Sequence, residues 1–292
     1  MTEIISDQKL QDGTFYPLSG VSTVTAVDPE DIFKYVVENA KRDTPRLSKL
    51  ETFRKVKGHD KSIALVGGGP SLKDHIKNIK GHDVIIAAGS SYDYMMREGV
   101  IPDYCMVCDP DTLVMNYMSI LNKDVKYLIA SGCHPDVFDY LKDYQVYMWH
   151  CHSDNMSERL LGIEKNYEGV GGGCTVGLRA ISVAILFGYT NIHFYGYDSC
   201  LGVDDAHHAY EFSTAKEVED LGQIYKLKVG ILETGPEEDA KVFSCAGYHL
   251  AQAEHFKQFY TNYGACFTPT FHGDGLLHAL YSVLISQKEV TK

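Results

Sequence analysis

The chain has 292 residues, enough for one large domain or for one domain with a small appendage. Its 27 Lys and Arg residues against 39 Asp and Glu residues give a net charge of −12, and such an acidic chain repels phosphate backbones, so we expect no nucleic-acid partner. Hydrophobic residues make up 45% of the chain, which argues against disorder, while no apolar run approaches the roughly 18 residues that cross a bilayer.

Helical patterns and short apolar runs alternate along the chain. After a weakly patterned lead-in, Asp28-Pro29 predicts a helix that runs to about Lys41, with Asp as the N-cap, and the stretch to His59 is predicted to be helical in part. Strands are predicted at 62–66, 83–88, 103–108, 125–130, 145–149, 192–195 and 265–268. Helices are predicted at 72–80, 92–98, 136–142, 175–187 and 250–262, with another beginning at Asp109-Pro110-Asp111.

Continuous apolar strands that alternate with helices are typical of a parallel sheet covered on both faces. We therefore predict an α/β, Rossmann-like fold with a mostly parallel sheet, helices on both faces and a short helical N-terminal extension. Residues 1–58 form the lead-in and extension, and residues 59–292 form the Rossmann-like domain. Ligands of such sheets bind beyond the carboxyl ends of the strands, so the residues that follow each strand are the informative ones.

A glycine-rich turn, Gly67-Gly68-Gly69-Pro70-Ser71, follows the first strand. Glycines allow close approach of a ligand, and the free amides of a helix start attract anions. The turn lacks the Gly-Lys-Ser/Thr of a P-loop, and Leu72 occupies the last glycine position of the dinucleotide fingerprint. An anion site and a purely structural tight turn both fit this pattern.

A second glycine cluster leads into the most apolar helix. It comprises Gly169 and Gly171 to Gly173 and ends at Cys174-Thr175. Two glycine-rich helix starts in one sheet would address two parts of one anionic ligand, whereas the alternative is a loop with Thr175 as an ordinary cap.

Acids and histidines follow two further strands. Asp109 follows the strand at 103–108, and Asp198 opens a polar segment that contains His207 and His208. A strand-end Asp binds a ribose hydroxyl or a metal, or caps the next helix, and the histidines are candidates for a general base.

Zinc binding by cysteine is not favoured. Cys105 and Cys108 have CxxC spacing, but they lie in a predicted strand where residues three apart face opposite sides, and no second CxxC exists. Without a secretion signal, the eight cysteines predict reduced thiols in a cytoplasmic protein. His249 and His255, in the late helix, are expected at the surface rather than as ligands.

Four motifs together resemble a known family. They are "IALVGGGPSL" (63–72), "GVIPDYCMVCDP" (99–110), "TVGLRAISVAILFGYTNIHFYGYDS" (175–199) and His208-Ala209. Their order and spacing resemble the family that groups archaeal 6-hydroxymethylpterin diphosphokinases with flagellar motility accessory factors. That family is in turn similar to bacterial sialyltransferases with a Gly-Asn-Gly-Pro-Ser turn. The resemblance covers roughly residues 60–270.

The resemblance implies a nucleotide-binding transferase. In the sialyltransferases the glycine turn and the Thr-led helix hold the CMP part of a CMP-sugar, a histidine is the base and tyrosines steady the leaving phosphate. In the pterin enzymes the same cleft would hold ATP and magnesium. Carried over to this chain, the nucleotide-binding residues would be Gly67, Gly68, Gly69, Ser71, Asp109, Gly173 and Thr175. The catalytic residues would be His208, Tyr210 and Asp198.

Three positions depart from the sialyltransferase pattern. Gly68 and Asp109 both stand where those enzymes have Asn, and Cys245 stands where they have their histidine, with His249 one turn later. His208-Ala209 instead follows the accessory-factor and pterin pattern.

We therefore expect a glycosyltransferase that uses a CMP-activated, sialic- or nonulosonic-type sugar without a cofactor. The alternatives are a magnesium-dependent 6-hydroxymethylpterin-type diphosphokinase, with Asp109 and Asp198 holding the metal, and a nucleotide-binding protein without catalysis. The expected partners are a nucleotide or nucleotide-sugar and a glycan or small-molecule acceptor. Oligomeric state stays open, with a homo-oligomer as one option.

Overall fold

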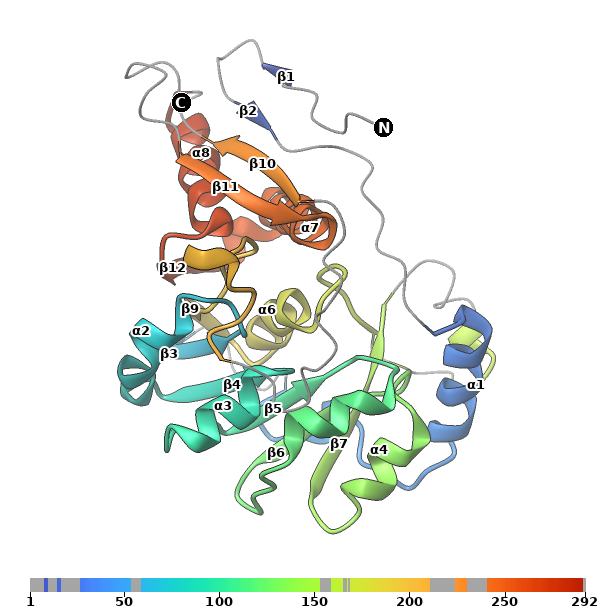
Figure 1. Cartoon of the computed structure of the whole chain (residues 1–292). Helices are drawn as coiled ribbons and strands as arrows, with labels where there is room; N and C mark the ends of the chain where they lie inside the picture. The colour runs from blue at the N-terminus through green and yellow to red at the C-terminus, as the bar shows by residue number, and fades with distance from the viewer. Residues whose placement is uncertain are drawn as a thin grey trace.

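The computed structural model describes most of the chain (Figure 1). The residues it describes are 27–53, 59–152, 159–164, 167, 169–210, 224–229 and 241–290, together with the short strands β1 (Gln8–Lys9) and β2 (Phe15–Tyr16). Much of the lead-in over residues 1–26 falls outside this part, as do some positions of the polar stretch before His59.

The centre of the molecule is an eight-stranded sheet in the order β12-β9-β3-β4-β5-β6-β7-β8. Every neighbouring pair in it is parallel, so the predicted Rossmann-like class is confirmed. The strands are β3 (His59–Val66), β4 (Val84–Ala88), β5 (Tyr104–Val107), β6 (Lys126–Ala130), β7 (Gln145–Cys151), β8 (Gly169–Val170), β9 (Tyr189–Tyr195) and β12 (Thr268–His272). The middle strands are buried along almost their whole length, which explains their continuous apolar sequences.

Helical segments connect the strands. They are α1 (Pro29–Asn39), η1 (Leu47–Lys49), α2 (Leu72–His75), η2 (Ile76–Gly81), α3 (Ser91–Arg97), η3 (Thr112–Met118), α4 (Pro135–Tyr140), α6 (Val176–Leu186), η4 (Val203–Asp205), α7 (Gly247–Tyr263), η6 (Gly264–Cys266) and α8 (Leu276–Val290). The expected caps are present: Asp28 accepts from the Glu30 amide at 2.7 Å, and Gly188, with φ +87°, follows the last turn of α6. None of the helices in the described ranges is long and apolar enough to span a membrane.

A small antiparallel pair, β10 (Ile224–Val229) and β11 (Lys241–Ala246), lies apart from the main sheet. Figure 1 shows it together with α7 and α8 at one end of the molecule. Strand β12 is the edge strand of the main sheet on that side.

Several elements differ from the sequence-based expectation. The strand expected at 265–268 is wrong, because Gly264–Cys266 is a 3-10 turn and β12 begins only at Thr268. The helices expected after Ser71 and Asp111 are largely 3-10 helices, since α2 has only four residues before η2 takes over and η3 is 3-10 throughout. The helix α8 and the strands β10 and β11 were not predicted.

The N-terminal helix α1 is joined to the main domain. The buried Asn39 amide donates to the carbonyls of Ser131 and Cys133, both at 2.9 Å. Arg42 forms an ion pair with Asp139 of α4 at 2.6 Å. A buried polar anchor of this kind fixes α1 in one position on the end of β6.

Candidate active site at the switch point of the sheet

Strand order reverses between β3 and β9. Strands β4, β5, β6, β7 and β8 follow one another on one side of β3. The chain then returns, and β9 and β12 lie on the other side of β3. In open parallel sheets the crevice beyond the carboxyl ends of such strands is the usual ligand site. A cavity of about 790 Å³ opens there, and its wall includes Gly67 to Gly69, Asp109, Thr175, Asp198 and His208. The structure thus brings most of the predicted site residues together.

The first glycine turn is bonded tightly to the end of β9. The Gly67 amide donates to the Tyr195 carbonyl at 2.8 Å, and the Gly69 amide donates to the Gly196 carbonyl at 2.9 Å. A Cβ at either glycine would lie 2.7 Å from the Gly196 oxygen. Gly67 and Gly69 are therefore glycines because two backbone segments meet there.

Gly68 faces a different group of atoms. A Cβ there would lie 2.9 Å from Ser90 Oγ, 3.0 Å from the Tyr210 hydroxyl and 3.6 Å from the His208 ring. The Ala209 amide also donates to the Gly68 carbonyl at 3.1 Å, which fixes the His208–Tyr210 segment against the turn. Of the three glycines, Gly68 is the one that borders the predicted catalytic residues.

Asp198 is hydrogen-bonded to the same turn. Its carboxylate accepts hydrogen bonds from the backbone amide and the hydroxyl of Ser71, at 2.9 and 3.0 Å. Burial raises the pKa of Asp198, and the two bonds from Ser71 oppose that shift. The two side chains are therefore hydrogen-bonded to each other. Ser71 is not among the residues that line the cavity.

Asp109 has a more open position, at the end of β5. Its carboxylate is exposed and accepts from the Asp111 amide at 2.9 Å. Partial desolvation by the surrounding wall raises the pKa of Asp109, and the Asp111 bond opposes this rise. Within the described residues, Asp109 and Asp198 belong to no group of three or more metal-ligating side chains.

The second glycine cluster shapes the start of α6. Gly172 and Gly173 have φ values of +120° and +111°, a region that side chains rarely adopt. A Cβ at Gly173 would lie 2.9 Å from His255 Cβ of α7, so this glycine allows α7 to pack closely and is not itself in the cavity wall. Thr175 caps α6 by accepting from the Leu178 amide at 3.4 Å. The N-terminus of α6, with its partial positive charge, thereby opens into the cavity.

Three histidines, His207, His208 and His249, lie in the cavity wall. His207 Nε2 is hydrogen-bonded to the Tyr248 hydroxyl, and His249 Nδ1 accepts from the Ala246 amide at 3.1 Å. The expectation that His249 lies at the surface is wrong, because only 4% of it is exposed. Since its Nδ1 is an acceptor, a neutral His249 carries its proton on Nε2 and serves as a donor rather than a base.

Tyr210 packs behind the glycine turn. Its ring stacks on Tyr94 with centroids 4.8 Å apart, and burial raises the pKa of its phenol. It is therefore a neutral hydroxyl next to Gly68, in contact with His208, and it is not itself among the residues that line the cavity.

Other side chains of the wall were not predicted. Arg179, one turn into α6, donates to the Val170 carbonyl and is the one lysine or arginine among the lining residues of the described chain. Cys108, Cys151 and Cys174 lie near it, and burial raises the pKa of all three thiols. Ile32 and Val36 of α1 complete the wall. The sequence did not indicate that Arg179 lines the cavity, because an arginine on a helix is usually a surface residue.

Comparison with known proteins supports the fold. The chain is similar to a MAf glycosyltransferase from Magnetospirillum magneticum AMB-1, with a TM-score of 0.62 and 16% identity over 84% of this chain and 36% of that protein. The chain thus spans about a third of the length of that glycosyltransferase. A mammalian sialyltransferase in complex with Gal-beta-1-3GalNAc-ortho-nitrophenol aligns with a TM-score of 0.43 and 12% identity over 92% of this chain and 93% of that one.

No curated protein sequence matches the chain. A family model, 6-hydroxymethylpterin diphosphokinase MptE-like, matches residues 32–204. The match begins inside α1, earlier than the four sequence motifs, and extends past the glycine turns, Asp109, Thr175 and Asp198. It covers three of those motifs, all but His208-Ala209, and confirms the family resemblance. The chain therefore belongs to the 6-hydroxymethylpterin diphosphokinase MptE-like family.

Proposed function

We propose that the chain is a nucleotide-dependent glycosyltransferase whose donor is a CMP-activated sugar of the sialic or nonulosonic type. The observation that carries this proposal is the bond from the Ala209 amide to the Gly68 carbonyl, which holds His208 beside the glycine turn. A candidate base and a candidate nucleotide cradle thus share one cavity. The likeness to a glycosyltransferase in fold agrees with it.

The nucleotide would lie between Gly68 and the start of α6. The amides of Gly67, Gly69 and Ser71 are already engaged within the protein. The first amides of an α-helix lack partners within the helix, and they carry the positive end of its dipole. The N-terminus of α6 is therefore the best place for the phosphate of CMP, with Gly68 leaving room for the nucleoside.

The transfer step then uses His208 as general base. His208 takes the proton of the acceptor hydroxyl as that oxygen bonds to the anomeric carbon of the sugar, and the bond from that carbon to the phosphate oxygen breaks. The departing CMP phosphate gains negative charge, which the α6 amides and the neutral His249 N–H stabilise. Proton and leaving group are both accounted for without a metal ion.

A diphosphokinase remains the second candidate, because the matching family model bears that description. This reaction requires magnesium between the phosphates of ATP. Asp109 fits the role, since its exposed carboxylate faces the cavity and magnesium takes one or two carboxylates plus phosphate oxygens. Asp198 fits less well, since its Oδ2 already accepts both bonds from Ser71 and only Oδ1 is left for a metal.

Thermal unfolding with added nucleotide separates the two candidates. A ligand that binds only the folded state raises the unfolding temperature by mass action. The glycosyltransferase proposal predicts stabilisation by CMP without metal, unchanged by a chelator. Stabilisation by ATP that requires magnesium, and that is lost in Asp109→Asn, would instead favour the diphosphokinase. No shift with either nucleotide would contradict both.

A further inference from the structure

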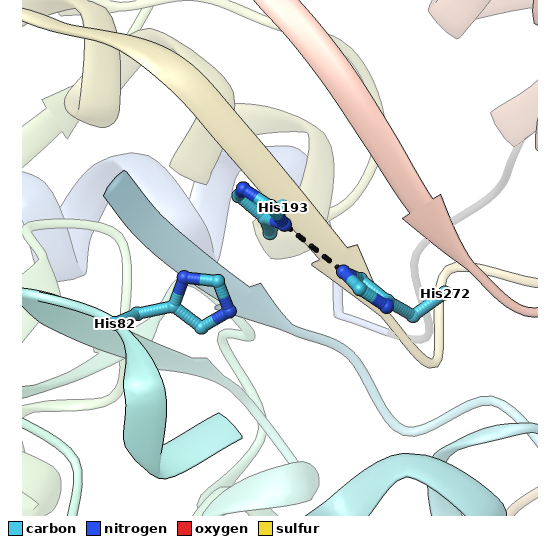
Figure 2. A group of neighbouring side chains, drawn as sticks. All are labelled: His82, His193 and His272. Atoms are coloured by element: carbon cyan, nitrogen blue, oxygen red, sulfur yellow. Dashed lines mark hydrogen bonds between the residues drawn. The ribbon is translucent and has the colours of Figure 1, made fainter. Parts of the chain in front are cut away.

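Three histidines from distant parts of the sequence meet on one face of the sheet, outside the active-site cavity. His82 follows the last residue of η2, His193 lies on β9 and His272 ends β12. Figure 2 shows the three rings gathered around a common centre. One ring nitrogen of each lies within 4.8 Å of the others, and no second group of this kind occurs in the described residues.

The register of the sheet creates this arrangement. On the parallel pair β9–β12, His193 is opposite Thr270 and Tyr195 is opposite His272. Residues two apart on a strand point to the same side, so His193, Tyr195 and His272 share one face. Their rings are in direct contact, with His272 stacked on Tyr195 at 4.1 Å and His193 stacked on His272 at 5.3 Å between centroids.

Hydrogen bonds hold the rings in place. His193 Nδ1 and His272 Nε2 are 3.0 Å apart, so one of the two carries a proton and the other accepts it. His82 Nδ1 lies 3.0 Å from Ser62 Oγ, and His82 Nε2 lies 2.8 Å from the Tyr195 hydroxyl. Two nitrogens that already share a proton are also placed to share a metal ion.

We propose that His82, His193 and His272 form a binding site for a divalent transition-metal ion of the zinc class. The set offers three imidazole nitrogens, the donor type that zinc, copper and nickel favour over magnesium or calcium. With Nδ1 of His82 bonded to Ser62 Oγ, the metal would take Nε2 in place of its present bond to the Tyr195 hydroxyl. His193 contributes Nδ1 and His272 contributes Nε2. The fourth position falls to water or to the Tyr195 hydroxyl.

The spacing needs only a small adjustment. Tetrahedral zinc with Zn–N bonds of 2.0–2.1 Å places its nitrogen ligands about 3.4 Å apart. The His193–His272 pair is already at 3.0 Å, so the ion would spread it slightly and draw His82 inward. All three side chains are partly exposed, which gives an ion access from solvent.

The surroundings suit a neutral donor set. Burial and the neighbouring histidines, including His75, lower the pKa of His272 to about 4, and burial lowers the pKa of His82 and His193 as well. Asp83 is the acidic group that opposes this for His82. None of the three histidines lies in the cavity wall, so the metal would not take part in transfer. It would instead link the end of η2, through His82, to strand β12, through His272.

Metal binding by the whole chain tests the proposal. Metal-free protein is titrated with zinc chloride, and bound zinc is counted after equilibrium dialysis. We expect one ion per wild-type chain and a rise in unfolding temperature with zinc concentration. The double variant His193→Ala/His272→Ala should lose both effects. The matched control, His152→Ala, removes an exposed histidine near the opposite edge of the sheet and should keep them.

Two further measurements keep the test decisive. His193→Asn preserves much of the side-chain volume, and its circular dichroism would show whether loss of zinc comes from unfolding. Cobalt in place of zinc should give the intense visible bands of a tetrahedral ion in the wild type and weak bands in His193→Asn. Equal zinc binding by the wild type and the folded variants would show that the ion binds elsewhere in the chain and would overturn the proposal. Absence of zinc binding by the wild type would overturn it as well.

Discussion

Asp198 accepts two hydrogen bonds from Ser71, one from the backbone amide and one from the hydroxyl, across 127 residues of sequence. The bonds join the carboxyl ends of β9 and β3, the two strands between which the order of the sheet reverses. Gly273 and Gly275 approach the same pair, and a Cβ at Gly275 would lie 2.4 Å from Asp198 Cα. Asp198 therefore holds the glycine turn in place through Oδ2, from its position in the cavity wall.

Replacing Asp198 by Ala should therefore lower the free energy of unfolding. The Ser71 amide and hydroxyl would lose their acceptor in a largely buried turn, at a cost of about 1–3 kcal/mol. Asp198→Asn keeps an acceptor oxygen and should cost less. Urea unfolding of both variants measures the difference. An alanine variant as stable as the wild type would show that Asp198 has no structural role.

His208 should be needed for catalysis rather than for binding. His208→Gln removes the proposed base, and loss of a general base costs about 10²–10⁴-fold in kcat. Affinity for CMP, measured by calorimetry, should stay within about twofold, because the proposed CMP cradle is formed by Gly68 and α6. His249→Gln is the matched control, since that buried ring is proposed to donate to the leaving phosphate, and its effect on kcat should be smaller. Equal losses in both variants would contradict the assignment of the base.

His150 should make stability depend on pH. It is 2% exposed, and burial, together with the cation of Arg46, lowers its pKa against the opposing effect of Glu164. Below the ordinary histidine pKa of about 6.5, the native state then binds fewer protons than the unfolded state. The contribution of neutral His150 to stability is therefore lost as the pH falls through that value.

The free energy of unfolding should therefore drop between about pH 7 and about pH 5.5 in the wild type. His150→Asn keeps a polar side chain opposite Ser131 and Glu164 but does not titrate in this range. Its unfolding free energy should show a smaller slope with pH. Parallel curves for the two proteins would rule out His150 as the titrating group.

The strands and the place of the site could be predicted from sequence because both follow from local patterns. Buried parallel strands are continuous apolar runs, and the glycine turns and strand-end acids follow them directly. This placed Gly68, Asp109, Thr175 and His208 near one crevice, and all four line the cavity in the structure.

Contacts between residues that are far apart in the sequence could not be predicted, because they leave no local sequence pattern. Nothing in the neighbourhood of Ser71 indicates that its partner is Asp198, and the register of β9 and β12 alone brings His193 to His272. Short segments were also ambiguous, because the apolar spacing of η3 and of Gly264–Cys266 fits a helix, a strand or a 3-10 turn equally well.

Gly68 and Gly69 should respond differently to alanine, although they are neighbours. A Cβ at Gly69 would lie 2.3 Å from Asp198 Oδ2 and 2.7 Å from the Gly196 backbone oxygen, and backbone has little room to move. Gly69→Ala should thus lose about 1–3 kcal/mol of unfolding free energy, typical of overpacking. At Gly68 the nearest atoms are side-chain hydroxyls rather than backbone: that of Ser90 at 2.9 Å, which can rotate away, and that of Tyr210 at 3.0 Å.

Gly68→Ala should therefore fold with nearly wild-type stability but bind CMP more weakly, because the methyl group occupies space next to His208. Urea unfolding and CMP calorimetry on both variants form the test, with Gly81→Ala as the control, since no atom lies within 4 Å of a Cβ at that position. If Gly68→Ala binds CMP as tightly as the wild type, the nucleotide does not contact the glycine turn, and the proposed cradle reduces to the N-terminus of α6.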